Sequence, residues 1–208
     1  MVFNIEKLMP KPRKELDPAK RKEYAEHYAT VMQERFGYIR KPVNAEAFDL
    51  IADYIGQYRA AMREECDYPK RGLFLFGEKG TGKTTALQLF SGFCDVDYLT
   101  VSSLTRVFSL GSFADFWKEV DEYKHRPLIV DDLGCEENHR SFGNEMPIAD
   151  FIREREILWK EKGVCTFFSS NAKGREDVAK RYGESVCSRI LGMCEFVKFT
   201  GNDNRLKR

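Results

Sequence analysis

The sequence predicts an α/β fold of three layers, in which a mostly parallel, five-stranded sheet is covered by helices on both faces. After residue 65, short apolar runs alternate with helical segments, and this alternation is typical of parallel sheets, whose strands are buried on both sides. A chain of 208 residues has room for one such domain with a short appendage. The expected strands are Gly72–Phe76, Asp97–Val101, Leu128–Asp131, Val164–Ser169 and Phe196–Phe199.

Two helices are expected before the sheet begins. Asp17 is a suitable N-cap, Pro18 suits the first helical position, and apolar side chains recur every four residues until Gly37. This stripe either packs on the main domain or docks a partner, and it consists of Tyr24, Tyr28, Met32 and Phe36. The second helix is expected from Asn44 to about Glu65, with an apolar face made of Phe48, Ile51, Ile55, Tyr58 and Met62.

The chain is accordingly divided into an N-terminal extension, residues 1–43, with one helix and a potential partner-docking role, and a main domain, residues 44–208. Residues 1–17 carry Pro10 and Pro12 and show no clear period, which predicts a flexible or extended lead.

The most informative motif lies between the first expected strand and the helix-like run Thr84–Phe90. Residues 77–84 fit the phosphate-binding loop pattern Gly-x-x-x-x-Gly-Lys-[Ser/Thr]. The glycines let backbone N–H groups point at an anion, the helix adds the positive end of its dipole, and Lys83 adds a full charge. ATP is the expected ligand, and the binding residues are Gly77, Glu78, Lys79, Gly80, Thr81, Gly82, Lys83, Thr84 and Thr85. A glycine-rich turn without a ligand is the alternative.

Two acidic residues follow the third expected strand, in the form of a Walker B motif. The strand delivers Asp131 to the carboxyl edge of the sheet, where it is expected to hold Mg²⁺ through water beside the hydroxyl of Thr84. Asp132 is expected to face a different way and to orient or deprotonate an attacking water. The alternative is a strand that leaves the sheet through a charged turn.

Two further side chains are candidates for catalysis. Asn171 follows the fourth strand and would lie near the γ-phosphate if this strand sits between the first and the third; otherwise it is a turn residue. Arg189 lies on an expected short helix. It either forms a surface salt bridge or neutralises charge on the phosphates from across a subunit boundary.

Composition narrows the class of protein. The 34 Lys and Arg residues nearly balance 33 Asp and Glu residues, so bulk charge does not predict a nucleic-acid or membrane partner. The six cysteines form no C-x-x-C pair and no zinc-type cluster, which indicates free thiols in a reducing compartment. With no apolar stretch of bilayer length and no signal-peptide core, a cytoplasmic protein is expected.

Taken together, the motifs resemble the AAA+ ATPases of the bacterial replicative helicase-loader family, the DnaC/DnaI type, which includes the IstB transposition helper. The likeness covers the chain from about residue 44 to its end. It rests on residues 77–84, 130–134 (Val-Asp-Asp-Leu-Gly), 169–171 (Ser-Ser-Asn), 182–190 (Tyr-Gly to Ser-Arg-Ile) and 201–205 (Gly-Asn-Asp-Asn-Arg).

The resemblance implies a sheet in the strand order 5-1-4-3-2 without a helical lid domain. It assigns Lys83 and Thr84 to the phosphates and Mg²⁺, Asp131 to the metal, and Asp132 to water activation. Asn171 corresponds to sensor 1 and Arg189 to an arginine finger that acts on a neighbouring subunit, which requires a homo-oligomer in the ATP-bound state. Arg205 corresponds to a terminal arginine that contacts phosphate or the subunit interface.

The same resemblance implies the partners. A loader acts on a replicative helicase and on single-stranded DNA, whereas an IstB-like helper acts with a transposase. Family members contact DNA between the second and third strands. Here Ser103–Tyr123 offers Arg106 and Lys118 with the aromatics Phe108, Phe113, Phe116 and Trp117, which form either a stacking platform or part of the core.

Two features depart from the family pattern. Asp132 is one methylene shorter than the glutamate that many AAA+ proteins carry, which predicts slow hydrolysis. About 40 residues precede the AAA+ portion, without zinc-binding cysteines, so the helicase partner depends on the stripe Tyr24/Tyr28/Met32/Phe36 being exposed. A metabolic P-loop kinase and an ATP-gated scaffold that never hydrolyses ATP are the competing hypotheses.

Overall fold

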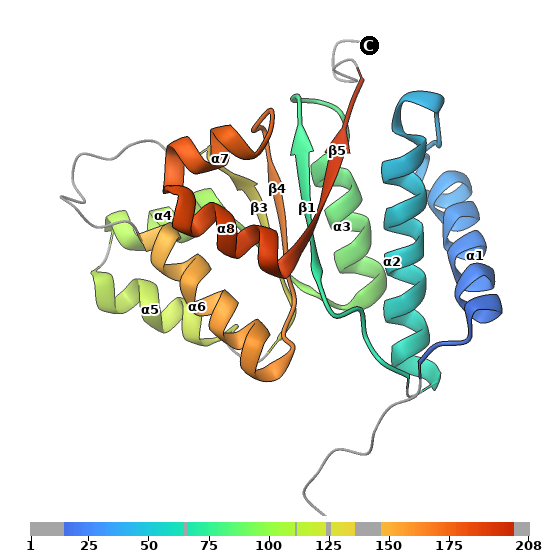
Figure 1. Cartoon of the computed structure of the whole chain (residues 1–208), viewed down its shortest axis with the longest axis horizontal. Helices are drawn as coiled ribbons and strands as arrows, with labels where there is room; N and C mark the ends of the chain where they lie inside the picture. The colour runs from blue at the N-terminus through green and yellow to red at the C-terminus, as the bar shows by residue number, and fades with distance from the viewer. Residues whose placement is uncertain (1–14, 65, 111, 124–125, 136–146, 202–208) are drawn as a thin grey trace, which may run out of the picture.

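A central sheet of five parallel strands organises the molecule. The computed structural model describes residues 15–64, 66–110, 112–123, 126–135 and 147–201. The sheet order is β2-β3-β4-β1-β5, and each neighbouring pair is parallel, which confirms the predicted fold and strand order (Figure 1). The strands are β1 (Gly72–Gly77), β2 (Asp97–Thr100), β3 (Leu128–Leu133), β4 (Thr166–Ser170) and β5 (Cys194–Phe199).

Three strand boundaries differ from the prediction by two residues. β3 continues through both acidic residues to Leu133, β4 begins only at Thr166, and β5 begins two residues early at Cys194. The reason is pairing, because the hydrogen-bond ladder continues where a neighbouring strand provides partners, whatever the polarity of the side chains. Gly72, for example, pairs with Cys194 at the start of β1 and β5.

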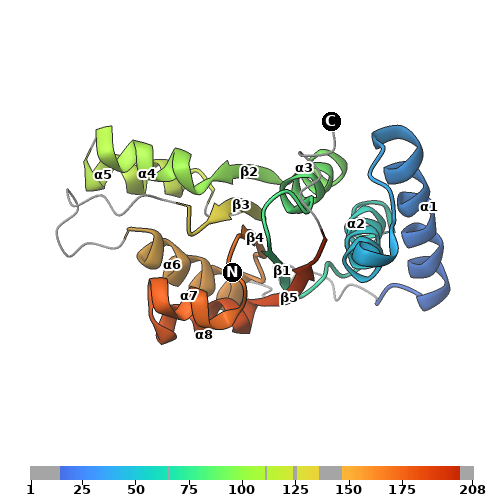
Figure 2. The same ribbon diagram turned by 90° about the horizontal axis from the view of Figure 1, so that it is seen from above.

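Helices cover the sheet in two layers (Figure 2). The helices α1 (Pro18–Phe36), α2 (Ala45–Glu64) and α3 (Lys83–Cys94) share one apolar core with residues of β1, β3, β4 and β5. A second core joins the remaining helices to the other face; these are α4 (Val101–Leu110), α5 (Phe113–Asp121), α6 (Pro147–Lys162), α7 (Arg175–Tyr182) and α8 (Glu184–Met193). None of the described helices is both long and apolar enough to cross a membrane.

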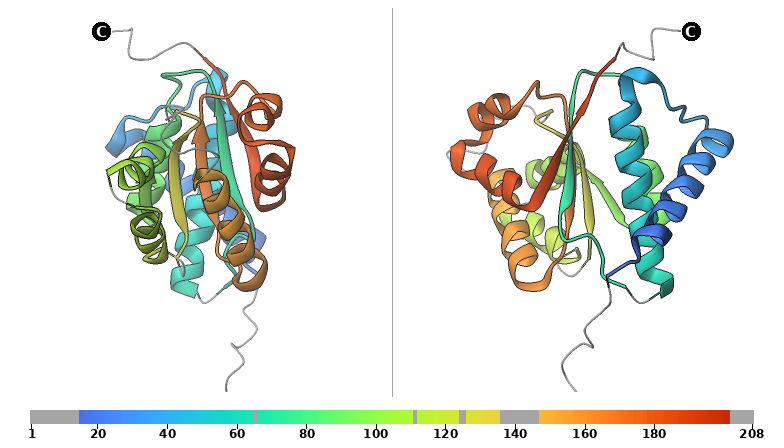
Figure 3. Two further views of the ribbon diagram at one scale, coloured as in Figure 1. Left: turned by 90° about the vertical axis from the view of Figure 1, so that its left-hand side faces the viewer. Right: turned by 45° about the vertical axis from the view of Figure 1, so that its right-hand side comes forward.

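The first helix forms as its sequence predicts and packs beside α2 (Figure 3). The Asp17 side chain accepts a hydrogen bond from the backbone N–H of Ala19, and Gly37 ends the helix in the left-handed conformation. Met32 is fully buried and Tyr28 nearly so, whereas Phe36 is 54% exposed. Tyr28 and Met32 therefore pack against the main domain, whereas Phe36 at the end of the stripe stays exposed, and a docking role for the extension stays a prediction.

The second helix buries most of its predicted apolar face. Phe48, Ile51, Ile55 and Tyr58 lie in the core, but Met62 is 47% exposed, and near this end of the helix Ala60 and Ala61 are the buried residues. Between α1 and α2 lies a short 3-10 helix, η2 (Pro42–Asn44), in the connection that joins the two helices beside the sheet (Figure 1).

The segment between β2 and β3 contributes to the core. Phe116 is fully buried and Trp117 packs against the second core, which decides the alternative for these two side chains in favour of packing. Arg106 and Lys118 are exposed. The side chains of Phe108 and Phe113 lie outside the described part of the chain.

Candidate active site

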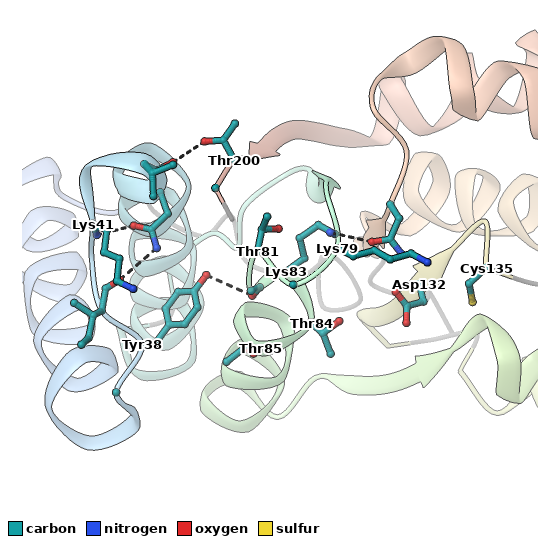
Figure 4. A pocket seen from close by; sticks show the side chains of 18 residues that line it. Tyr38, Lys41, Lys79, Thr81, Lys83, Thr84, Thr85, Asp132, Cys135 and Thr200 are labelled. Carbon is teal, nitrogen blue, oxygen red and sulfur yellow. Dashed lines mark hydrogen bonds between the residues drawn. The ribbon is translucent and has the colours of Figure 1, made fainter. Parts of the chain in front are cut away.

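The carboxyl ends of the parallel strands meet at one edge of the sheet, where ligands bind in open α/β folds. A cavity of about 1190 Å³ lies there, lined from one side by the loop after β1 and from the other by Asp132 and Asn171 (Figure 4). Lys79, Gly80, Thr81, Gly82, Lys83, Thr84 and Thr85 all line it. The sequence-predicted phosphate loop, the second acidic residue and the sensor asparagine therefore share one cavity.

The phosphate loop owes its shape to its glycines. Gly80 and Gly82 have φ values of +74° and +102°, which favour glycine. Gly77 is required for a second reason, because a Cβ there would lie 2.1 Å from the carbonyl oxygen of Phe199 in β5. Glu78 is exposed, and its carbonyl accepts a hydrogen bond from the Thr81 hydroxyl. Gly77 and Glu78 thus shape the loop, whereas residues 79–85 form the cavity wall.

Lys83 is the buried cation of the site, with 5% of its surface exposed. Its Nζ donates to the carbonyl oxygens of Gly77 at 2.9 Å and Glu78 at 2.7 Å, and to Oδ1 of Asn171 at 3.1 Å. The contact with Asn171 exists because β4 lies between β1 and β3. The structure thereby fulfils the condition on which the role of Asn171 depended.

A β-bulge presents the two acidic residues differently. In the pairing of β3 with β4, the register shifts between Val130 and Leu133, so that Asp131 and Asp132 together face Ser169. Asp132 takes a left-handed φ of +61°, and its N–H donates to Oγ of Ser169 at 2.9 Å. Asp131 is buried, while Asp132 is partly exposed and lines the cavity.

Asp131 is surrounded by hydroxyl groups. Its Oδ1 accepts hydrogen bonds from Oγ1 of Thr84, at 3.3 Å, and from Oγ of Ser169. Oδ2 accepts a hydrogen bond from the hydroxyl of Tyr98 on β2, at 2.5 Å. A carboxylate beside a hydroxyl is an oxygen donor set that suits Mg²⁺, so the residues present fit the predicted metal, and Thr84 and Asp131 would hold it.

The far wall of the cavity comes from residues that the sequence reasoning missed. It is formed by the connection between α1 and α2 and by the residues after β5. The ring of Tyr38 lies against Gly82 and its hydroxyl donates to the Gly82 carbonyl at 3.4 Å, while Thr200 donates to the carbonyl of Val43 at 2.6 Å (Figure 4). Burial raises the pKa of Tyr38, so its hydroxyl stays a neutral donor. No spacing in the sequence links residue 38 to residue 82.

Arg189 lies away from this cavity in its own subunit. It is on α8 and pairs with Glu156 of α6, which Lys160 also contacts at 2.8 Å. Hydrogen bonds from these two cations hold the pKa of Glu156 below its ordinary value, although burial opposes its ionisation. An action of Arg189 on a neighbouring subunit stays a prediction, and Arg205 lies outside the described residues.

Comparison with solved structures identifies the fold. The crystal structure of the DnaC helicase loader matches with a TM-score of 0.55 and 22% sequence identity, over 79% of this chain and 94% of that one. A candidate primosome component from Streptococcus pyogenes serotype M3 matches with a TM-score of 0.56 and 20% identity, over 93% of this chain and 94% of that one. The resemblance drawn from the motifs is confirmed in the fold, which this chain shares with the DnaC helicase loader and the primosome component. No protein-family model and no curated protein matches the sequence.

Proposed function

We propose that this protein is an ATP-dependent replication helper, which binds ATP with Mg²⁺, assembles into an oligomer in that state and loads a replicative helicase onto single-stranded DNA. The nucleotide part rests on one observation, the convergence of Lys83, Thr84, Asp132 and Asn171 on a single cavity with Asp131 directly behind Thr84. The replication part rests on the motifs and on the names of the two structural neighbours, a helicase loader and a candidate primosome component.

The side chains divide the chemistry of hydrolysis among them. Bound Mg²⁺ would supply charge neutralisation on the β- and γ-phosphates. Lys83 and the loop N–H groups would hold the phosphates, since a phosphate oxygen can replace the carbonyl acceptors of the lysine. Asp132 would accept a proton from an attacking water, and the Asn171 amide would orient this water without adding charge. The short side chain of Asp132 supports slow turnover.

The outer wall of the cavity is where the base of the nucleotide would lie. Ile39 and Val43 are half exposed, at 54% and 50%, and both line the cavity. Flat apolar surface suits the face of a purine, while the nearby backbone groups offer hydrogen bonds to its edge. We therefore assign the connection between α1 and α2 to base binding, which gives the N-terminal extension a role in the ATP site.

Arg189 from a neighbouring subunit would complete the site in the oligomer. Its side chain is 34% exposed on α8, so an adjacent subunit can reach it if the pair with Glu156 opens. For DNA, the exposed cations Arg106 and Lys118 flank a segment whose Phe116 is buried, so phosphate contact is favoured over stacking there.

The helicase contact requires a surface other than the buried Tyr28 and Met32. We expect all of these steps in the cytoplasm.

The decisive experiment uses the Asp132→Asn variant, which should bind ATP and stay in the assembled state. Wild type should release phosphate from ATP without any small acceptor molecule, whereas a metabolic kinase would need such an acceptor. If ATP turnover in D132N equals that of wild type, the result would support the non-hydrolysing scaffold. Purified D132N is then tested for co-purification with the replicative helicase in the presence of ATP, with Lys83→Ala as the control that should not bind nucleotide. Capture of a transposase instead would assign the protein to transposition.

A further inference from the structure

The carboxylate of Asp131 is oriented by groups on three different elements. Thr84 comes from α3, Ser169 from β4 and Tyr98 from β2. Oδ1 accepts two of these hydrogen bonds and Oδ2 accepts the one from Tyr98. A carboxylate has about four acceptor positions. These three hydrogen bonds leave one acceptor position, on Oδ2, for a water bound to the metal. The arrangement determines which lone pairs of Asp131 are available.

Tyr98 reaches Asp131 because of the register between β2 and β3. Tyr98 lies level with Ile129, and Asp131 is two residues further along β3 on the same face of the sheet. A tyrosine is long enough to span this diagonal, and its hydroxyl ends 2.5 Å from Oδ2. The sequence shows only an aromatic residue in a short strand, so the pairing could not be read from it.

Tyr98 and the phosphate-loop helix meet at the same carboxylate. Oδ1 of Asp131 accepts a hydrogen bond from Thr84 of α3, and Oδ2 accepts one from Tyr98 of β2. Tyr98 therefore contacts the carboxylate that is proposed to share the metal with Thr84.

We propose that Tyr98 is a positioning residue of the metal site, which holds the carboxylate plane of Asp131 so that Mg²⁺ is bound together with Thr84. This rests on the proposed ATP site. The terminal torsion of an aspartate is broad and roughly two-fold, so the backbone alone does not fix the plane of the carboxylate. With hydrogen bonds on Oδ1 alone, the carboxylate plane of Asp131 can still rotate. The hydrogen bond on Oδ2 prevents this rotation. Groups that orient metal ligands in this way are worth about 10- to 100-fold in metal affinity.

The test separates metal binding from nucleotide binding. The affinity of a fluorescent ATP analogue is measured for wild type and Tyr98→Phe, first in EDTA and then across a Mg²⁺ titration. Both proteins should bind equally in EDTA within about twofold, whereas Y98F should need about 10- to 100-fold more Mg²⁺ for the half-maximal effect. Titration with Mn²⁺, followed by loss of the free-ion paramagnetic signal, should rank the proteins in the same order.

Two further variants serve as references. Tyr54→Phe removes the hydroxyl of a buried tyrosine that does not line the cavity, and should leave the Mg²⁺ requirement unchanged. Ser169→Ala removes a donor from Oδ1 and should raise the Mg²⁺ requirement less than Y98F does, because the bond on Oδ2 that fixes the carboxylate plane remains. The unfolding temperature of each variant is recorded, since a role in packing alone would lower it without moving the Mg²⁺ midpoint.

The outcomes are distinct. A Y98F protein with the wild-type Mg²⁺ midpoint overturns the role of Tyr98 and leaves the ATP site intact. Wild type that binds no nucleotide overturns the ATP site and this inference with it. A midpoint raised more in Y98F than in S169A, with Y54F unchanged, supports the assignment.

Discussion

Lys83 and Asn171 are joined by a hydrogen bond of 3.1 Å between Nζ and Oδ1, which connects the phosphate-loop helix α3 to the carboxyl end of β4. The lysine also donates to the carbonyls of Gly77 and Glu78, so three acceptors surround an ammonium group that has three N–H donors. An incoming phosphate therefore competes with groups that already stabilise the charge. The first two predictions follow from this contact.

Replacing Lys83 with alanine should weaken nucleotide binding strongly. A charged hydrogen bond to phosphate contributes about 1.5–3 kcal/mol, which corresponds to about a 10- to 100-fold loss of affinity. The matched control is Lys79→Ala, which removes an exposed lysine from the same loop and should cost much less. Titration calorimetry with ATP measures both, and equal losses would mean that charge near the loop matters more than the position of Lys83.

Replacing Asn171 with alanine should slow hydrolysis and leave ATP binding largely intact. The amide is proposed to orient the attacking water, and loss of one such group typically costs about 10²-fold in kcat. The control is Asn44→Ala, which changes another asparagine of the cavity wall. The Asn44 amide hydrogen-bonds the backbone of Lys41 and Ile39 in the connection between α1 and α2. Its loss should therefore change KM. Steady-state ATPase kinetics separate the two; a change in KM alone for N171A would refute the role.

If Arg189 acts across a subunit boundary, two inactive variants should restore each other. Arg189→Ala keeps an intact ATP site, and Lys83→Ala keeps the arginine. In a mixture of the two variants, some subunit interfaces therefore combine an intact ATP site from one subunit with an intact Arg189 from the other. ATP turnover of the mixture should exceed the sum of the separate proteins, because the arginine contributes about 10³-fold or more in comparable enzymes. Absence of recovery, together with loss of stability in R189A, would assign Arg189 to the pair with Glu156 alone.

The ion pair of Glu156 should make stability depend on pH. Since the folded-state pKa of Glu156 is lowered, its contribution is present above the unfolded pKa and is lost as pH falls through the folded value. Glu156→Gln should therefore be less stable than wild type at pH 7, by about 1–2 kcal/mol. The difference should begin to shrink near the ordinary pKa of 4.5 and vanish at lower pH. Urea denaturation at several pH values measures it, and a difference that does not depend on pH would contradict the prediction.

The N-terminal helix should owe its position to Met32. Met32→Ala deletes a fully buried side chain between α1 and the main domain and should cost about 2–5 kcal/mol. Phe36→Ala, at the exposed end of the same stripe, should cost far less. Tyr38 and Val43 of the cavity wall follow this helix directly, so M32A should also weaken ATP binding. Unchanged ATP binding in M32A would mean that the helix has no role in the site.

The sequence by itself predicted the fold class, and the family that its motifs resemble implied the strand order; the structure confirms both. It also predicted that Lys83, Thr84, Asp132 and Asn171 meet at one site, and they line one cavity, with Asp131 beside Thr84. Their chemical roles stay predictions. The placement could be predicted because it depends on local order: a loop between a strand and a helix, or a polar residue at the end of a buried strand. Only the tertiary structure decided the partners of these residues. The bulge at Asp132, the contact of Tyr98 with Asp131, the wall formed by Tyr38 and the pairing of Arg189 with Glu156 join segments far apart in the chain. Such contacts depend on strand register and packing, which local sequence does not encode.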